Sequence, residues 1–234
     1  MSPSNEREAR RQVADAARRL DLLGLNHGAT GNLSLRWHRG ARDGFLVTPG
    51  AMPPESIGDD DVVWLPLDDE DPLAGLIDAA AAPPVAASRA PSSEAPLHRA
   101  MHRHCCAAAV VHGHAPFATA LSCVPSVREH GIPAFHYMVA MAGGDSIRCA
   151  RYQTFGTRAL ADAVVEAMRD RKACLVASHG LVAIGADLAS AIDMAVETEY
   201  LSRVYAQALQ IGAPVLLDKG DIGKVQQGFS TYLR

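Results

Sequence analysis

The chain has 234 residues, of which 48% are hydrophobic and 21% are charged, and its formal net charge is −4. This length and apolar content predict one large domain that buries its own core. Because no basic run is present, the composition argues against nucleic-acid binding, and no run of about 18 apolar residues predicts a membrane span. The polar start does not resemble a signal peptide, and the five cysteines form no C-x-x-C pair. We therefore expect a cytoplasmic protein.

The first part of the chain predicts a helix, three short strands and an insertion. Residues 7–25 repeat small and apolar side chains about every 3.6 positions, which is typical of an amphipathic helix. Strand-like runs follow at 32–37, 44–48 and 61–67, and a polar turn separates the first two. Residues 68–91 begin with acids and continue with alanines and prolines. Since few large apolar groups are available to anchor it, we expect this segment to be a flexible surface insertion.

The rest of the chain alternates between helix and strand patterns. The long helix is expected to begin after a capping Asp187, and Ser92 or Ser93 is placed to cap the first helix. Several strands are close enough to pair as hairpins, which favours a single α/β domain, spanning 1–234, with a mixed or mainly antiparallel sheet flanked by helices. The predicted helices are 93–104, 115–121, 157–169 and 187–211, and the predicted strands are 107–111 and 173–177.

Two histidines stand in a His-Gly-His motif at the end of a predicted strand. Alternate residues of an extended backbone point to the same side, so His112 and His114 converge. His179 follows a second apolar strand in a Ser-His-Gly setting. If the two strands meet, three imidazoles with one open position form the donor set of a catalytic zinc site. Capped core or surface histidines are the alternative interpretation.

Glu94 stands at the start of a predicted helix. One interpretation is a carboxylate that the helix dipole stabilises; the other is a carboxylate that acts as acid and base beside a metal. Further along this helix, His98 and His102 are one turn apart, but the glutamate of an H-E-x-x-H motif is missing between them. We therefore interpret that pair as a packed or solvated helix face.

Three turns are rich in backbone N–H groups, which suit an anion such as phosphate. They cover residues 28–32, 48–50 and 92–93. Their spacing is neither that of a dinucleotide-binding G-x-G-x-x-G motif nor that of a Walker A loop, so nucleotide binding has no support.

These motifs together resemble the class II aldolase/adducin family. The resemblance covers nearly the whole chain apart from 68–91, and its segments stand in the family's order. It implies a three-layer α/β/α domain with a central, mainly antiparallel sheet, and a homotetramer with active sites between subunits. The matching segments are 28–35, 48–50, 92–94, 110–114, 132–150, 152–158 and 178–180.

The resemblance also implies a chemistry and a role for each matching residue. The expected reaction is the reversible cleavage of a 1-phosphorylated ketose, such as L-fuculose 1-phosphate, to dihydroxyacetone phosphate and a short aldehyde. Zn²⁺, or Mn²⁺ or Co²⁺ in its place, would be bound by three histidines, with a glutamate that is catalytic and also touches the metal. A tyrosine from a neighbouring subunit would handle the proton at the aldehyde oxygen. By similarity, the metal ligands are His112, His114, His179 and Glu94, the tyrosine is Tyr137, the aldehyde side is lined by Phe155 and Tyr232, and the phosphate cradle is Gly31, Asn32, Gly50, Ser92 and Ser93.

One departure from the family pattern falls on the phosphate cradle. The member that the chain most resembles has a Thr-Pro-Thr-Gly turn, where this chain has Thr48-Pro49-Gly50-Ala51. A hydroxyl is therefore missing at Gly50, although its backbone N–H remains. A charge-assisted hydrogen bond is worth about 1.5–3 kcal/mol, so we expect weaker phosphate binding or a different acceptor.

Other functions remain open at this point. A 5-deoxypentulose or methylthioribulose 1-phosphate aldolase would use the same site, and a ribulose-phosphate 4-epimerase of the same superfamily would use the same metal. An adducin-like interaction module has the same fold without catalysis, but it has no reason to keep three site histidines and Glu94 together.

Overall fold

A seven-stranded sheet forms the centre of the protein, in a computed structural model that describes residues 3–68 and 89–232. The strand order is β3-β2-β1-β4-β9-β8-β7, and every pairing is antiparallel except that of β7 with β8. The prediction of a mainly antiparallel sheet is therefore confirmed. The strands are β1 (Asn32–Arg36), β2 (Gly44–Val47), β3 (Val63–Pro66), β4 (Ala109–Gly113), β7 (Cys149–Ala150), β8 (Ala173–Val176) and β9 (Gly180–Gly185).

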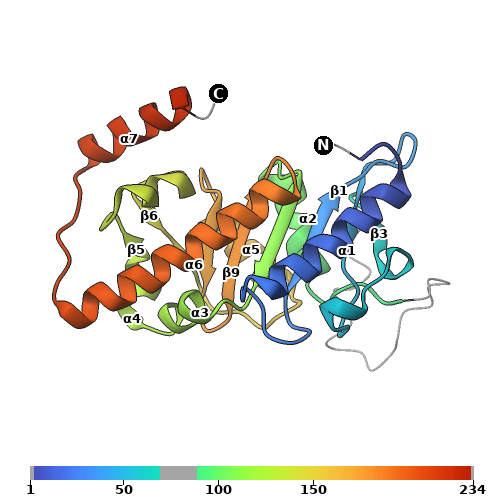
Figure 1. The fold of residues 1–234 in the computed structure, drawn as a ribbon, viewed down its shortest axis with the longest axis horizontal. Helices are drawn as coiled ribbons and strands as arrows, with labels where there is room; N and C mark the ends of the chain where they lie inside the picture. Colours follow the sequence, from blue (N-terminus) through green and yellow to red (C-terminus); the bar gives the residue numbers. More distant parts are fainter. Residues whose placement is uncertain (1–2, 69–88, 233–234) are drawn as a thin grey trace.

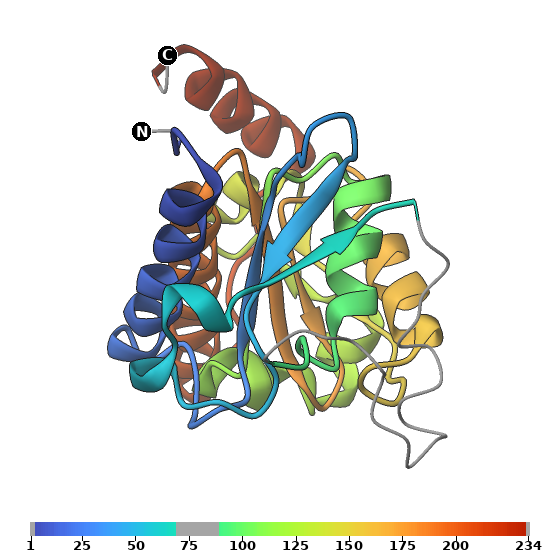
Figure 2. The same cartoon turned by 90° about the vertical axis from the view of Figure 1, so that its right-hand side faces the viewer.

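Helices cover both faces of the sheet and give the three layers seen in Figures 1 and 2. One face packs against α1 (Glu6–Leu22), α3 (Pro116–Ser122) and α6 (Leu188–Ile211), and the other against α2 (Ala95–His104) and α5 (Arg158–Ala167). Strand residues alternate between the two layers. In β4, Val111 lies in the cluster with α1 and α6, whereas Val110 lies in the cluster with α2 and α5. His112 therefore faces the α2 side.

Smaller elements complete the fold beyond the β8 side of the sheet. A two-stranded sheet pairs β5 (Ile132–Pro133) with β6 (Ser146–Ile147), next to α4 (Pro125–His130) and the 3₁₀ helix η3 (Tyr137–Ala142). The last helix, α7 (Lys219–Tyr232), packs Ile222 against Ala134 and Ala140. Two further 3₁₀ turns, η1 (Pro54–Ser56) and η2 (Asp59–Asp61), precede β3.

The expected helix boundaries agree with the structure within a few residues, with one correction at a cap. Asp187 caps α6 as predicted, since its side chain accepts from the backbone N–H of Ser190. The expected serine cap of α2 is wrong: Glu94 occupies the cap position without a side-chain cap. The Ser92 hydroxyl instead accepts from the backbone N–H of Glu94, at 3.2 Å.

The predicted insertion at 68–91 falls mainly on residues 69–88, which lie outside the described residues. At its far end the chain is anchored again, because Pro91 forms a β-bridge with Pro49 and Arg89 pairs with Asp61 at 2.9 Å. In the described ranges, none of the helices has the length and apolar content needed to cross a membrane.

Candidate metal centre and adjoining cavity

Four side chains from separate parts of the chain converge at one end of the sheet. His112 lies near the end of β4, His114 follows that strand, and His179 lies in the turn between β8 and β9. Because β9 pairs with β4, with Gly113 opposite Leu181, the turn that carries His179 is brought beside the His-Gly-His motif. Glu94 precedes α2, which covers the face toward which His112 points. The condition that the two strands meet is therefore fulfilled.

The distances between these side chains suit a single shared cation. Oε2 of Glu94 lies 3.0 Å from Nε2 of His112, and Oε1 of Glu94 lies 3.4 Å from Nε2 of His179. The Nε2 atoms of His112 and His114 are 3.1 Å apart. Two ligand atoms bound tetrahedrally at about 2.0–2.1 Å from zinc lie roughly 3.4 Å from each other. One donor atom from each of the four residues falls within 4.8 Å of the other three, the one such group found among the described residues.

Close backbone packing explains the glycines that flank the histidines. A Cβ at Gly113 would lie 2.4 Å from the carbonyl oxygen of Leu25, and one at Gly180 would lie 2.3 Å from the carbonyl oxygen of Gly113. Neither position therefore has room for a side chain. Ser178, directly before His179, has a φ of 52°, a left-handed conformation that is rare for residues other than glycine. The turn that carries His179 therefore has an uncommon backbone conformation.

A backbone contact orients the most buried ligand. Nδ1 of His112 donates to the carbonyl oxygen of Leu181, at 2.9 Å, because a carbonyl can only accept. This hydrogen bond places a proton on Nδ1, so in the neutral ring that binds a metal the lone pair is on Nε2, whereas in the protonated ring Nε2–H donates to Glu94. Such a partner on the far nitrogen is typical of metal-binding histidines.

The electrostatics of the cluster keep the carboxylate charged. Burial by itself raises the pKa of Glu94, but the nearby positive His112, a hydrogen bond from it, and His179 outweigh burial and hold that pKa well below its usual range. In turn, burial lowers the pKa of His112 but the Glu94 carboxylate outweighs burial and raises it. Burial, together with the charge of His112, lowers the pKa of His114 and of His179 to about 4. These two rings are therefore neutral near pH 7, the form that binds metals.

One buried oxygen shows that the cluster suits a bound cation. Oε1 of Glu94 is buried, and none of the residues in the described ranges forms a hydrogen bond with it. An unpaired buried carboxylate oxygen is costly unless a cation or another donor reaches it. Together with three imidazole nitrogens, this oxygen gives the mixed nitrogen and oxygen donor set that zinc and similar divalent ions bind.

A cavity of about 410 Å³ adjoins the cluster and collects most of the predicted site residues. Glu94, His114 and His179 form part of its lining, and Phe155 is 55% exposed at its side. Its lining also includes Gly31, Asn32, Gly50, Ser92 and Ser93, all of them predicted for the phosphate cradle. Thr30, from the N–H-rich turn at 28–32, lines it too, as do Tyr152, Gln153 and Ser178, for which we predicted no role.

The predicted phosphate donors differ in what they contact. The backbone N–H of Gly50 donates to the carbonyl oxygen of Ala90, at 3.1 Å, and that of Gly31 donates to Oδ1 of Asn26, at 2.6 Å. Both N–H groups are thus already used, contrary to what we expected of Gly50. Asn32 donates its amide to Glu94. Among the described residues, none forms a hydrogen bond with the exposed Ser93, so both its hydroxyl and its backbone N–H are available, whereas the backbone N–H of Ser92 donates to the carbonyl oxygen of Thr48.

The elements that carry Tyr137 and Tyr232 pack against each other away from the cavity. Tyr137 is 49% exposed at the start of η3, and it does not line the cavity. The helix that ends at Tyr232, α7, packs against η3. Figures 1 and 2 show α7 beyond the end of the sheet opposite to the start of β1. Within this chain η3 and α7 are therefore separated from the cluster, and the roles of Tyr137 and Tyr232 stay predictions.

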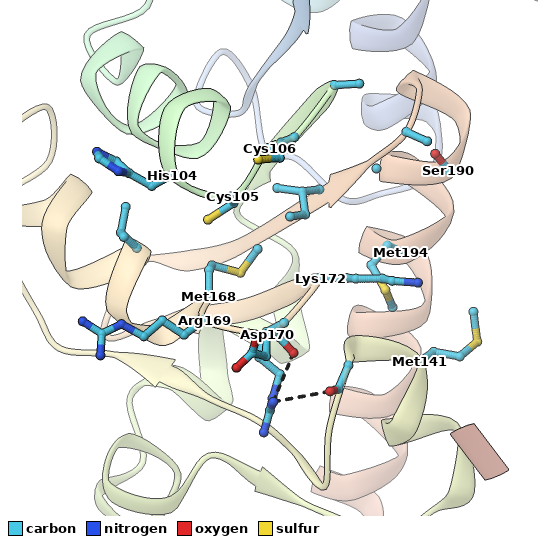
Figure 3. Close-up of a pocket in the computed structure, with 18 of the residues that line it drawn as sticks. His104, Cys105, Cys106, Met141, Met168, Arg169, Asp170, Lys172, Ser190 and Met194 are labelled. Atoms are coloured by element: carbon cyan, nitrogen blue, oxygen red, sulfur yellow. Dashed lines mark hydrogen bonds between the residues drawn. The ribbon is translucent and has the colours of Figure 1, made fainter. Parts of the chain in front are cut away.

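A larger cavity of about 1280 Å³ lies at the opposite ends of β4, β8 and β9. Figure 3 shows its labelled cationic side chains, Arg169 and Lys172, pointing in different directions. Cys105 and Cys106 also line it, and both are free thiols. This cavity contains no convergent set of donors, so size alone does not identify the functional site.

Comparison with known proteins identifies the family of the chain. The sequence model of the Class II Aldolase and Adducin N-terminal domain matches residues 11–206. The 5-methylthioribulose-1-phosphate/5-deoxyribulose-1-phosphate aldolase of Rhodospirillum rubrum is 41% identical over 231 residues, covering 98% of this chain and 95% of that protein. The L-fuculose phosphate aldolase of Escherichia coli K12 is 38% identical over 224 residues, which cover 95% of this chain and 94% of that protein.

A solved aldolase structure has the same fold as this chain. The structure of an L-fuculose 1-phosphate aldolase superposes with a TM-score of 0.81 at 29% identity, and the superposition covers 98% of both chains. The matched family model spans most of the chain, and both sequence relatives extend over nearly its full length. The chain therefore belongs to the class II aldolase and adducin family.

Proposed function

We propose that this protein is a metal-dependent aldolase that reversibly cleaves a 1-phosphorylated ketose to dihydroxyacetone phosphate and a short aldehyde. The observation that carries the proposal is the cluster of three imidazoles around a buried carboxylate with one unpaired oxygen, open to a cavity. The aldolase names of the relatives in the same family support it. A non-enzymatic interaction module would not need this donor set.

Zinc is the ion that we propose for the cluster. His112, His114 and His179 would hold it, and Glu94 stands within reach of the same position. When bound, such an ion acts as a Lewis acid toward substrate oxygens and stabilises negative charge that develops on them. Since the three imidazoles are neutral ligands, they leave the positive charge of the ion undiminished.

Glu94 is proposed to move the proton at the carbon that gains or loses a bond. Its low pKa makes it a carboxylate near neutral pH, which is the form that removes a proton from dihydroxyacetone phosphate in the direction of bond formation. In the direction of cleavage, the same carboxyl group returns a proton to that carbon. Asn32 and His112 both contact Oε2, so Oε1 is the oxygen proposed to take up and return the proton.

The aldehyde side of the site is proposed to come from two subunits of a homotetramer. Phe155 of the same chain lines the cavity. Tyr137 and Tyr232 would be supplied by a neighbouring subunit, with Tyr137 handling the proton at the aldehyde oxygen. The distance of η3 and α7 from the cluster of their own chain supports a role in another subunit's site.

The phosphate is proposed to bind in the part of the cavity lined by Gly31, Gly50, Ser92 and Ser93. Ser93 has a hydroxyl and a backbone N–H that no described residue uses, and both can donate to phosphate oxygens. A side chain at Gly50 is hindered, because its Cβ would lie 3.1 Å from the carbonyl oxygen of Pro91. The family's hydroxyl at that position is thus replaced by close backbone packing.

A substrate panel tests the proposal. Metal-loaded protein is supplied with L-fuculose 1-phosphate, 5-deoxyribulose 1-phosphate and 5-methylthioribulose 1-phosphate, the substrate types in the relatives' names. Dihydroxyacetone phosphate is measured by coupled reduction, and epimerisation of ribulose phosphate is measured alongside. We expect at least one ketose to be cleaved, with activity lost on chelation and restored by Zn²⁺. Epimerisation without cleavage would replace the aldolase by the superfamily's epimerase.

A further inference from the structure

A chain of buried polar side chains leads away from Glu94 into the layer between β1 and α2. Nδ2 of Asn32 donates to Oε2 of Glu94, at 2.9 Å, and Oδ1 of Asn32 lies 2.5 Å from Nε2 of His98. Nδ1 of His98 lies 2.7 Å from the hydroxyl of Ser34, which is also 2.8 Å from Nε2 of His102. The histidine pair of α2 is thus a packed face, one of the two alternatives that the sequence left open.

These groups are removed from solvent. Ser34 and His98 are 0% exposed, His102 is 1% exposed and Asn32 is 5% exposed. Burial, reinforced by neighbouring histidines, lowers the pKa of His98 to about 3, and burial lowers that of His102 to about 4. Both rings are therefore neutral near pH 7. Buried polar groups of this kind are costly unless each has a partner, so their contacts restrict which way each can point.

The donors and acceptors of this chain can be assigned in one direction. An ionised Glu94 only accepts, so the amide NH₂ of Asn32 faces it and Oδ1 faces His98. Oδ1 also only accepts, so the proton of the neutral His98 ring is on Nε2. Nδ1 of His98 is then an acceptor, 2.7 Å from the hydroxyl of Ser34. Rotation of the Asn32 amide by 180° would place two acceptors at Glu94 and two donors at His98.

His102 is bound at its other end by the backbone. Its Nδ1 donates to the carbonyl oxygen of Ala107, at 2.8 Å, so Nε2 is the acceptor of this neutral ring. Ser34 has a single hydroxyl proton and can serve His98 or His102, but not both at once. His102 therefore contacts the network only at Ser34, whereas His98 contacts Asn32 directly.

We propose that His98 is a positioning residue that fixes the amide of Asn32 so that it donates to Glu94. With Oε2 held by this amide and close to His112, the carboxylate keeps the orientation in which Oε1 forms no hydrogen bond with any described residue. The consequence for catalysis rests on the aldolase function proposed above. Loss of the His98 contact frees the Asn32 amide to rotate, which removes the donor from the carboxylate without removing a metal ligand.

Three variants of the metal-loaded protein separate positioning from packing. His98→Phe keeps a ring of similar volume but has no donor, and His98→Gln keeps an N–H that can reach Asn32. His102→Phe is the matched control, one turn further along α2 and equally buried. For His98→Phe we expect kcat to fall roughly 10- to 100-fold, as for partners of metal-site residues, with KM and metal content almost unchanged. His98→Gln recovers most of this loss, and His102→Phe lowers kcat far less than His98→Phe.

Nitrogen NMR of histidine-labelled protein tests the orientation without any substrate. We expect the Nε2–H tautomer for His98 and the Nδ1–H tautomer for His102, and loss of the single tautomer of His98 in Asn32→Leu. An Nδ1–H tautomer at His98, or equal kcat losses in His98→Phe and His102→Phe that follow their losses of unfolding free energy, would overturn the proposal. Wild-type protein that cleaves no ketose phosphate refutes the proposed function instead, and the NMR experiment then decides the orientation by itself.

Discussion

Oε2 of Glu94 lies 3.0 Å from Nε2 of His112, although one residue precedes a helix and the other lies in the central strand β4. This contact joins the layer of α2 to the sheet at the point where His114 and His179 also arrive. A carboxylate in this place can serve both the metal and the substrate.

Replacement of Glu94 by glutamine tests its role in proton transfer. The amide keeps the size of the side chain and an oxygen for the metal, but it cannot take up a proton. We expect Glu94→Gln to retain most of the metal and to lose roughly 10²- to 10⁴-fold in turnover, the usual contribution of a positioned acid or base. Metal analysis and the rate of dihydroxyacetone phosphate formation check this. Turnover equal to that of the wild type would exclude Glu94 as the acid and base.

Replacement of a histidine ligand should remove metal and activity together. His114→Ala deletes one of three imidazole donors, so we expect the metal content to fall well below one ion per chain and cleavage to be lost. His104→Ala is the matched control, because His104 is an exposed histidine that lies at the end of α2, outside the cluster. An active, metal-free His114→Ala protein would contradict the proposed centre.

Tyr137→Phe should lower turnover without unfolding the protein. The ring is 49% exposed, so loss of its hydroxyl is expected to change the free energy of unfolding by less than about 0.5 kcal/mol. Turnover should fall because the proton at the aldehyde oxygen then has no carrier. Circular dichroism during denaturation gives the free energy of unfolding, and steady-state kinetics give the turnover.

Mixed oligomers show whether Tyr137 acts in a neighbouring subunit. Inactive Glu94→Gln and weakly active Tyr137→Phe proteins are unfolded together, refolded and assayed. If active sites are shared between subunits, some mixed interfaces combine a wild-type Glu94 with a wild-type Tyr137, and activity rises above that of either parent. Activity that stays at the mean of the parents would place both residues in the same subunit's site, or Tyr137 outside any site.

Ser93→Ala should weaken phosphate binding selectively. Because no described residue bonds to Ser93, its loss should leave stability unchanged. A charge-assisted hydrogen bond is worth about 1.5–3 kcal/mol, so we expect KM for a ketose phosphate, or the inhibition constant of inorganic phosphate, to rise by roughly 10-fold or more. A non-phosphorylated ketose serves as the control, since its slow cleavage should not change. An equal effect on both sugars would argue against a phosphate contact.

The buried histidines of α2 should make the protein sensitive to acid. Burial lowers the pKa of His98 to about 3 and that of His102 to about 4, whereas both return to about 6.5 in the unfolded chain. Below pH 6.5 the unfolded state thus binds more protons, and stability falls as the pH decreases toward 4. Each ring contributes a slope of about 1.4 kcal/mol per pH unit.

Denaturant unfolding between pH 7 and pH 4 measures this slope. His98→Gln is the comparison, because it removes one titrating ring while every other group stays the same. We expect the slope of the variant to be smaller than that of the wild type over this range. Identical slopes would mean that His98 is already protonated in the folded protein.

Local sequence patterns predicted the helices whose amphipathic repeat and capping residue can be read from neighbouring positions. The amphipathic repeat located α1, and the cap and repeat located α6 to within a residue at each end. Strand β9 was not predicted, although its Leu-Val-Ala-Ile run between glycines suits a buried strand; it is stabilised by pairing with β4 and β8. The sequence analysis also missed α7, which contains several glycines and packs Ile222, Val225 and Phe229 against another segment.

The amino-acid sequence by itself determined which donor groups are available: the His-Gly-His motif, His179, Glu94 and the family to which their pattern belongs. Only the tertiary structure decided how they are used, because these residues are far apart in the chain and meet through the β4–β9 pairing and the cover of α2. The same is true of Asn32, whose expected place at the phosphate stays a prediction: it lines the cavity with the other cradle residues, and its amide donates to Glu94. A hydrogen bond forms with whichever partner lies about 3 Å away, and that choice depends on packing, not on neighbours in sequence.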